Sequence, residues 1–177
     1  PPVRTDFFTP GDCDRDDFWL VAGALEPYKR VDLAIESARI AGRRLIIAGR
    51  GSCLNSLRAI AHRDVTFVTD ATDDMMRALY RRARVLLHPQ VEDFGIVAVE
   101  AQACGLPVAA FARGGALETV EHEITGRHFA DQSADLLADA AEHAPEPDDP
   151  RIRAAALRFG PVRFAQSFSA IIRRHVG

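Results

Sequence analysis

Residues 18–51 read FWLVAGALEPYKRVDLAIESARIAGRRLIIAGRG. This stretch contains two short apolar runs, at 18–22 and 45–48, separated by residues 31–40, in which apolar side chains recur at helical spacing. Apolar runs of this kind are typical of parallel strands that helices cover on both faces. The stretch therefore predicts a strand, a helix and a second strand in succession.

The remainder of the chain repeats this alternation. We expect further strands at residues 65–68, 85–87, 107–111 and 126–129. Helices are expected at 52–61, 72–82, 95–104, just after Gly114–Gly115, and at 133–143, 151–158 and 161–175. Ser52 and Thr72 are predicted N-caps, and Gly105 is predicted to close the helix at 95–104. The repeated order predicts an α/β fold with a doubly wound, Rossmann-like parallel sheet.

The composition excludes some classes of partner and site. The formal net charge is -3 with both signs interspersed, so the chain lacks the concentrated basic face that nucleic-acid binding needs. Cys13, Cys53 and Cys104 are odd in number and far apart, which predicts free, mostly buried thiols and no disulfide framework or zinc site. Because we find no secretory signal and no apolar run of about 20 residues, we expect a cytoplasmic protein. The start at Pro1 without Met indicates a fragment or a processed chain.

Glycines and charged residues gather just after the predicted strands. In a doubly wound sheet, ligands bind at the carboxyl ends of the strands. The segments that follow these ends are 23–29, 49–51, 92–95 and 113–115. We therefore expect the functional residues in these four segments.

The strongest of these signals runs from Glu92 to Glu100. One carboxylate stands at a strand end, Gly95 lies at a helix start, and the second carboxylate lies inside the helix. Two carboxylates beside the free N–H groups of a helix N-terminus suit a polyhydroxylated, anionic ligand. The alternative places both carboxylates on solvated surfaces. The apolar neighbours of Glu100 weigh against this alternative, since a partly buried carboxylate needs a partner.

Five blocks of the sequence resemble, in order, the family-4 (group 1) glycosyltransferases. Members of this family have two domains in the GT-B architecture, and their C-terminal domain carries two glutamates separated by seven residues. The matching blocks are 3–10, 25–32, 49–51, 92–108 and 113–126. The runs PYKRVDLA and RGGALET are most similar to bacterial and archaeal mannosyltransferases of polysaccharide or O-antigen synthesis.

The resemblance implies the donor-binding half of a retaining, metal-independent enzyme that transfers mannose from GDP-mannose to a glycan or lipid-linked acceptor. Glu92 and Lys29 are then the catalytic candidates: Lys29 neutralises the diphosphate, and Glu92 holds the donor sugar. Glu100 accepts hydrogen bonds from the ribose hydroxyls. The remaining candidates for donor binding are Phe94, Gly95, Ile96, Gly23, Arg50, Gly51 and Arg113.

The resemblance also implies the domain organisation and the partners. Residues 1–15 form an interdomain segment, 16–144 the Rossmann-like domain, and 145–177 a stiff, exposed connector with C-terminal helices that return toward an absent N-terminal domain. The implied partners are the nucleotide-sugar donor and that acceptor-binding domain, and association of the intact enzyme with the inner face of the membrane stays open. No cofactor and no metal are expected. Asp12–Cys13–Asp14 fits a bare Asp-x-Asp pattern, but it precedes the first strand.

Two departures from the family pattern leave alternatives open. Ala24 stands where the family usually has an arginine on the diphosphate, and our hypothesis is that Arg50 or Arg113 partly replaces it. Thr69 stands where many members have glycine, near the expected position of the base. The alternatives are therefore a UDP-sugar donor, or a stand-alone or degenerate nucleotide-sugar-binding module without catalysis.

Histidines and the single tryptophan are expected to be structural. A structural role is preferred over catalysis for His88, and a core position is preferred over a sugar platform for Trp19. The other candidates have no common spacing and are expected at the surface; they are His62, His122, His128 and His143.

Overall fold

The computed structural model describes residues 1–176, which form a six-stranded, all-parallel sheet. The strands are β1 (Phe18–Ala22), β2 (Arg44–Ala48), β3 (Val65–Val68), β4 (Val85–His88), β5 (Val108–Phe111) and β6 (Gly126–Phe129). Their order in the sheet is β3-β2-β1-β4-β5-β6, with every pairing parallel. The chain winds outward from the centre in both directions, which confirms the predicted doubly wound sheet and puts the switch point between β1 and β4.

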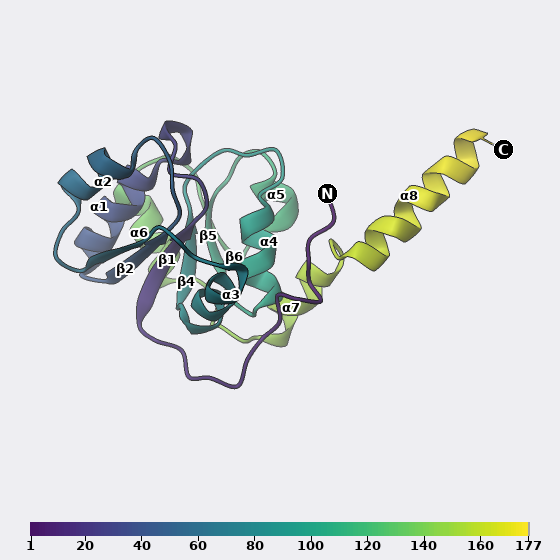
Figure 1. Ribbon diagram of the computed structural model, residues 1–177, viewed down its shortest axis with the longest axis horizontal. Coiled ribbons are helices and arrows are strands. Elements are labelled where there is room, and N and C mark those ends of the chain that lie inside the picture. Colours follow the sequence, from purple (N-terminus) through teal and green to yellow (C-terminus); the bar gives the residue numbers. More distant parts are fainter. Residues whose placement is uncertain (177) are drawn as a thin grey trace.

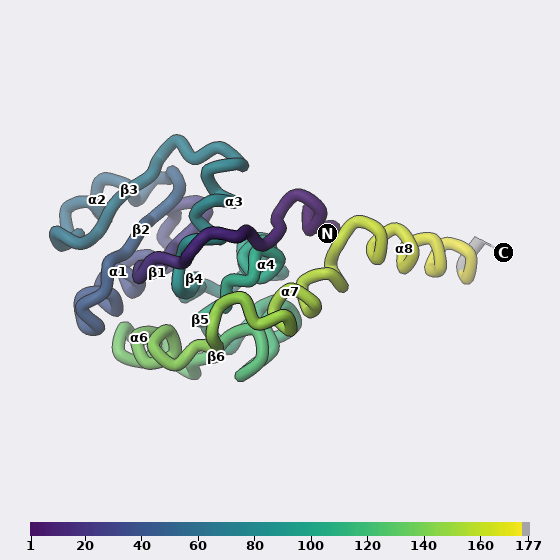
Figure 2. The backbone as a smooth tube through the Cα atoms, turned by 90° about the horizontal axis from the view of Figure 1, so that it is seen from below, coloured from purple at the N-terminus to yellow at the C-terminus, as the bar shows by residue number. Residues whose placement is uncertain are grey.

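Helices cover both faces of this sheet (Figures 1 and 2). One layer contains α1 (Val31–Ala41), α2 (Leu54–Ile60) and α6 (Ala134–Glu142), which share one hydrophobic core. The other layer contains α3 (Asp73–Arg82), α4 (Ile96–Ala103), α5 (Ala116–Thr119) and α7 (Pro150–Leu157), which share the second core. The sheet is therefore buried on both sides, as its apolar strands predict.

Strand β1 shows how the sequence builds two cores at once. Successive side chains of a strand point to opposite faces. Phe18 and Leu20 pack into the core beneath α3 and α4, while Trp19 and Val21 pack into the core beneath α1 and α6. All four are buried, and the predicted core position of Trp19 is confirmed.

The helix caps agree with prediction except at Ser52. The Thr72 hydroxyl accepts a hydrogen bond from the Met75 amide at the start of α3, and Gly105 follows α4 with a φ of 78°. Ser52 is not a cap, because its amide and hydroxyl both donate to the Glu26 carboxylate (3.0 and 2.6 Å). Helix α2 therefore begins at Leu54, two residues later than predicted.

The first fifteen residues lie along the helical layer that contains α3, α4 and α7. Val3 and Phe8 are buried in the second core. Arg153 of α7 donates to the backbone carbonyls of Thr5 and Phe8, 3.3 and 3.1 Å away. The buried side chains of Val3 and Phe8, together with the hydrogen bonds from Arg153, tie the segment to the layer that contains α7.

Residues 143–149 join α6 to α7, and the part from 145 is tied to the body of the protein. Arg15 binds both oxygens of Asp148 at 2.7 Å, and Arg84 binds Glu146 at 2.7 and 3.0 Å. The expected connector is thus exposed in part but fixed by two bidentate ion pairs, and α7 begins at Pro150.

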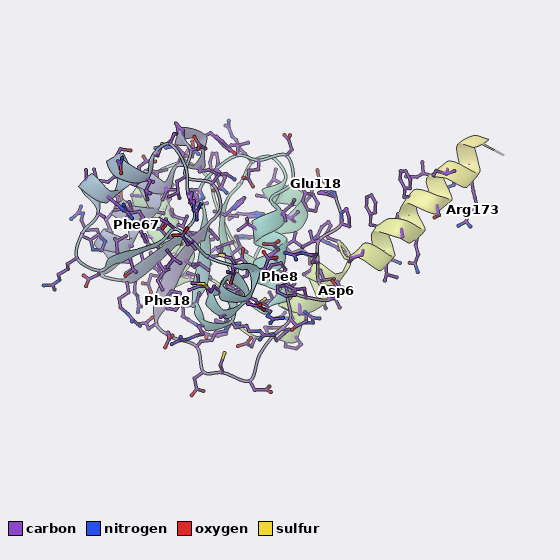
Figure 3. All side chains as sticks on the ribbon, in the orientation of Figure 1. Asp6, Phe8, Phe18, Phe67, Glu118 and Arg173 are labelled. Carbon is purple, nitrogen blue, oxygen red and sulfur yellow. The ribbon has the colours of Figure 1, made fainter. Side chains whose placement is uncertain are left out.

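Helix α8 (Pro161–Val176) extends away from the rest of the molecule, as the position of Arg173 in Figure 3 shows. It leaves several apolar side chains exposed, among them Val162, Phe164, Phe168 and Ile172. Over residues 1–176, none of the helices is both long and apolar enough to cross a membrane.

The expected surface positions of the histidines are confirmed for His122 and His143 and wrong for the other two. His62 and His128 are half-buried, and the Nε2 atom of each is enclosed without a hydrogen-bond partner among the described residues. Each lies close to a sheet edge, His62 before β3 and His128 within β6, and the His128 ring stacks on that of His122, 5.5 Å between centroids.

Candidate functional site

Among the hollows of the described chain, two adjoin the N-terminal half of α4, where the carboxyl ends of β1 and β4 meet. The Glu100 hollow, about 470 Å³, is lined by residues 23, 24, 48–50, 69–71, 76, 80, 97 and 100. The Glu92 hollow, about 410 Å³, is lined by Pro1, Tyr28 and residues 91–96. The predicted carboxylates thus lie at the expected edge of the sheet, one in each hollow.

Glu100 lies on the side of α4 that faces the Glu100 hollow, and it is half-buried. Its Oε2 accepts a hydrogen bond from the Tyr80 hydroxyl at 3.2 Å. Burial raises the pKa of the Glu100 carboxyl, and burial with the neighbouring carboxylate raises the pKa of Tyr80. A carboxylate has about four lone-pair positions, so beyond this single donor Glu100 can accept hydrogen bonds from ligand hydroxyls.

Tyr80 belongs to the candidate site, and the sequence reasoning missed it. Its ring is fully buried and packs edge-on against Phe8, 5.7 Å between centroids. A buried tyrosine hydroxyl requires a partner. The helix predicted at 72–82 did not indicate which carboxylate this partner is. Only the packing of α3 against α4 brings it to Glu100.

The loops after β1 and β2 form the opposite wall of the Glu100 hollow. Gly23 and Arg50 line it, and the Arg50 guanidinium pairs with Asp70 and donates to the Thr69 carbonyl. Gly51 lies instead against Leu25, whose amide donates to the Arg50 carbonyl at 2.7 Å. A Cβ on Gly51 would come within 2.3 Å of the Leu25 carbonyl oxygen. Close packing of the two loops therefore requires glycine at 51.

Lys29 and Glu92 form an ion pair beside the Glu92 hollow. Lys29 ends the short 3₁₀ helix η1 (Pro27–Lys29) and is only 9% exposed. Burial lowers its pKa. Its Nζ also lies 5.2 Å from the centroid of the Tyr28 ring, which forms an exposed wall of the hollow. The two residues predicted to be catalytic are thus in direct contact, with both charges largely withdrawn from water.

The start of α4 separates the two hollows. Gly95 precedes the helix with a φ of 83°, a conformation that favours glycine. Ile96 is exposed at the first helical position, so its amide is one of the N–H groups without a partner inside the helix. Phe94 packs edge-to-face on Phe159, 5.4 Å between centroids, and this contact fixes the loop before the helix.

His88 and Gln90 lie beneath Glu92. His88 is 1% exposed, its Nδ1 is 2.9 Å from the Gln90 amide nitrogen, and its Nε2 is 3.8 Å from Glu92 Oε2. Burial, and secondarily the Lys29 charge, lower the pKa of His88 to about 3. His88 is therefore neutral near pH 7 and lies next to the predicted catalytic pair.

Arg113 lies outside both hollows, at the end of β5. It is exposed and stacks over the Phe111 ring, 5.7 Å from its centroid. Of the two arginines that we considered as replacements for the cation absent at Ala24, Arg50 therefore shares the hollow with Ala24 and Arg113 does not.

The described residues contain no group of three or more histidine, cysteine or acidic side chains arranged to hold a metal ion. Asp12, Cys13 and Asp14 are all exposed on the segment before β1. The expectation of mostly buried thiols holds for Cys104, which is buried, and is wrong for Cys13.

Residues 4–154 match the protein family described as Glycosyl transferases group 1. A curated relative, D-inositol 3-phosphate glycosyltransferase of Mycobacteroides abscessus, is 37% identical over 163 residues, which cover 79% of this chain and 37% of the relative. The enzyme of the same name from Mycolicibacterium paratuberculosis is 33% identical over 195 residues, covering 96% and 43%. The chain thus spans less than half the length of these relatives.

Solved structures share the fold. Sucrose-phosphate synthase from Thermosynechococcus elongatus superposes with a TM-score of 0.84 at 23% identity, covering 99% of this chain and 51% of that one. Anabaena Alr3699/HepE in complex with UDP gives 0.82 at 20% identity, covering 98% and 56%. AviGT4, a glycosyltransferase involved in avilamycin A biosynthesis, gives 0.80 at 22% identity, covering 98% and 56%.

Proposed function

Because this chain belongs to the glycosyl transferases group 1 family, we propose that it is the donor-binding half of a two-domain, retaining, metal-independent glycosyltransferase. The observation that carries the proposal is the placement of Glu100 on one side of the start of α4 and of the Lys29–Glu92 pair on the other. A nucleotide sugar has hydroxyls at both ends and a dianionic diphosphate between them. Its three parts correspond to the two hollows and the helix start that joins them.

In this proposal the nucleoside end of the donor occupies the Glu100 hollow. The ribose hydroxyls donate to Glu100, which the Tyr80 hydroxyl holds in place. The diphosphate passes the loop at Gly23 and Ala24 and reaches the N-terminus of α4, whose free N–H groups and positive dipole end favour an anion. The sugar then lies in the Glu92 hollow, where the Glu92 carboxylate accepts from its hydroxyls.

Lys29 supplies the positive charge that the leaving diphosphate needs. The ammonium donates to a diphosphate oxygen as the bond from the sugar carbon to that oxygen breaks and negative charge builds up there. Such a contact is strong where water is excluded, and Lys29 is already largely buried. Arg50 becomes a second cation on the diphosphate if its side chain turns away from Asp70. Arg50 then replaces in part the arginine that is absent at Ala24.

The identity of the donor is a finer proposal. Mannose and guanosine remain predictions from the sequence. The structural relative Alr3699/HepE was solved with UDP, which supports the UDP-sugar alternative, whereas the name of the curated relatives, D-inositol 3-phosphate glycosyltransferase, specifies no nucleotide base. The acceptor, the N-terminal acceptor-binding domain, the cytoplasmic location and contact with the membrane likewise belong to the proposal for the longer protein.

A module that binds nucleotide sugar without transferring it is the second candidate, and Ala24 favours it. With one cation fewer on the diphosphate, binding and leaving-group stabilisation both weaken. Transfer of sugar by the longer protein with Ala24 in place would exclude this candidate.

Thermal unfolding of the 177-residue chain with GDP, UDP, ADP and their sugars tests the proposal. A ligand present at about 100 times its Kd stabilises the folded chain by about 2.7 kcal/mol. We expect a clear rise in Tm with at least one nucleoside diphosphate and a larger rise with one of its sugars. The absence of any shift at millimolar concentration would contradict donor binding, whereas a larger shift with UDP than with GDP would overturn only the mannose assignment.

A further inference from the structure

His88 lies at the end of β4 with its ring enclosed and its two nitrogens in different surroundings. The Gln90 amide nitrogen, 2.9 Å away, donates to Nδ1. Since a neutral imidazole carries one proton, this bond places the proton on Nε2. Gln90 is itself buried, which keeps water from competing for Nδ1.

The protonated Nε2 faces Glu92. It lies 3.8 Å from Glu92 Oε2, while Lys29 contacts the other oxygen, Oε1. Gly95 leaves the space for this arrangement, since a Cβ there would stand 3.3 Å from His88 Nε2 and 3.7 Å from Glu92 Oε2. The Glu92 carboxylate thus lies between a cation that contacts one oxygen and a neutral N–H that faces the other at 3.8 Å, beyond hydrogen-bond distance.

We propose that His88 is a positioning residue of the donor site, fixed by Gln90 as its Nε2–H tautomer so that it orients Glu92 toward the hydroxyls of the donor sugar. This inference rests on the proposed function. Its physical reason is that the proposed diphosphate competes for Lys29. When Lys29 turns to the phosphate, Glu92 loses its cation, and a small movement closes the 3.8 Å gap so that the N–H of His88 donates to the carboxylate.

A neutral donor suits this position better than a second cation. Lys29 and Glu92 are the charged groups that the structure places against His88. A protonated imidazole would repel Lys29 and neutralise Glu92 fully, which would weaken its acceptance of sugar hydroxyls. Burial and Lys29 both keep the ring neutral.

The test compares binding of a diphosphate and of its sugar to the 177-residue chain. Isothermal titration gives the Kd of UDP, UDP-glucose, GDP and GDP-mannose for the wild type, His88→Phe and His88→Gln. The sugar increment is the ratio of the diphosphate Kd to the nucleotide-sugar Kd. We expect His88→Phe to reduce this increment about tenfold, the equivalent of about 1.4 kcal/mol, and to leave the diphosphate Kd within about twofold. His88→Gln keeps an N–H donor and should retain most of the increment.

Two further variants control the test. His143→Phe changes an exposed histidine on the opposite helical layer and should leave every Kd unchanged. If His88→Phe does not fold, as judged by circular dichroism, Gln90→Met removes the donor to Nδ1 and should also lower the sugar increment without changing diphosphate binding.

Three outcomes overturn the inference. An unchanged sugar increment in His88→Phe, or an equal weakening of diphosphate and nucleotide sugar, would assign His88 a purely structural role. A wild type that binds a diphosphate but gains nothing from either sugar would also overturn it. A wild type that binds none of the four ligands would instead overturn the proposed function, and the inference with it.

Discussion

The two hollows beside α4 each contain one carboxylate, but they hold it in different ways. In the Glu100 hollow the carboxylate has a neutral partner, Tyr80, and the nearby cation, Arg50, is paired with Asp70 at the surface. In the Glu92 hollow the carboxylate already has a buried cation, Lys29. The first hollow therefore offers an acceptor whose charge the fold does not neutralise, and the second offers a charge pair that is already largely desolvated before a ligand arrives. Under the proposed function, the first hollow governs nucleotide affinity, and the second governs the handling of the sugar and the leaving group.

Breaking the Lys29–Glu92 pair should give the largest effect on stability. Lys29→Met leaves Glu92 charged and largely enclosed, and loss of one partner of a buried pair costs about 3–5 kcal/mol. We expect the free energy of unfolding, measured with urea, to fall by an amount toward the lower end of this range, because Glu92 keeps 16% side-chain exposure. The double variant Lys29→Met/Glu92→Gln should recover much of the loss.

The surface pair Arg84–Glu146 is the matched control, since its side chains are 35% and 79% exposed. Arg84→Met should cost less than about 1 kcal/mol. Equal losses from Lys29→Met and Arg84→Met would show that the Glu92 hollow gives its ion pair no special environment.

Removing the Glu100 charge should raise stability, whereas removing the Lys29 charge should lower it. Burial raises the pKa of Glu100, so the folded chain retains this proton to higher pH than the unfolded chain, and stability falls as pH rises through the raised pKa. Glu100→Gln removes that penalty and keeps an acceptor for Tyr80, so Tm at pH 7 should rise. The same change removes a charge-assisted contact to ribose, which weakens nucleotide binding by about 1.5–3 kcal/mol. A lower Tm or an unchanged Kd would contradict this account of the hollow.

Lowering the pH should destabilise the folded chain through His88, which lies next to Glu92. Its pKa falls to about 3 in the folded chain and is about 6.5 in an unfolded chain. Above pH 6.5 the residue is neutral in both states and contributes no pH dependence. Below that value the unfolded chain binds the proton, so His88 lowers stability by about 1.4 kcal/mol per pH unit. Urea unfolding between pH 7 and 5 should show a shallower decline in His88→Gln, and identical slopes would contradict a buried neutral imidazole.

The smallest expected effect separates the two arginines. Arg50 lines the Glu100 hollow but is exposed, so Arg50→Ala should weaken nucleotide binding by less than about 1 kcal/mol. Arg113→Ala should leave the Kd unchanged, because Arg113 lies over Phe111 outside the hollow. A loss with Arg113→Ala and none with Arg50→Ala would reverse our assignment of the second cation.

The sequence predicted the sheet and the edge at which the candidate site lies because these follow from patterns along the chain. The five residues of β1 alternate between two cores, and the unbroken apolar run at 18–22 already predicts burial on both faces. The positions of Glu92 and Glu100 follow from their place after a strand and within the next helix. Both are local properties that hold before any tertiary contact forms.

What the sequence left out depends on contacts between distant segments. Ser52 does not cap α2 because its hydroxyl donates to the carboxylate of Glu26, which lies in another loop. Position 51 requires glycine because a Cβ there would clash with the backbone of Leu25. Tyr80 meets Glu100 only through helix packing, and Arg50 and Arg113 both follow strands yet point to different places. Spacing fixes where a backbone position lies, whereas the direction of a side chain depends on its neighbours.

The central claim is that the two hollows form one donor site across the start of α4, and amide NMR of the ¹⁵N-labelled chain tests it directly. A nucleoside diphosphate should shift the amides of Gly23, Gly49 and Glu100 and, through its phosphates, those of Gly95 and Ile96 at the start of α4. The matching nucleotide sugar should add a shift at Glu92, and in the titration with the sugar the amides of both hollows should report one common Kd. Shifts confined to one hollow with the nucleotide sugar, or different Kd values for the two sets, would show separate sites and contradict the account.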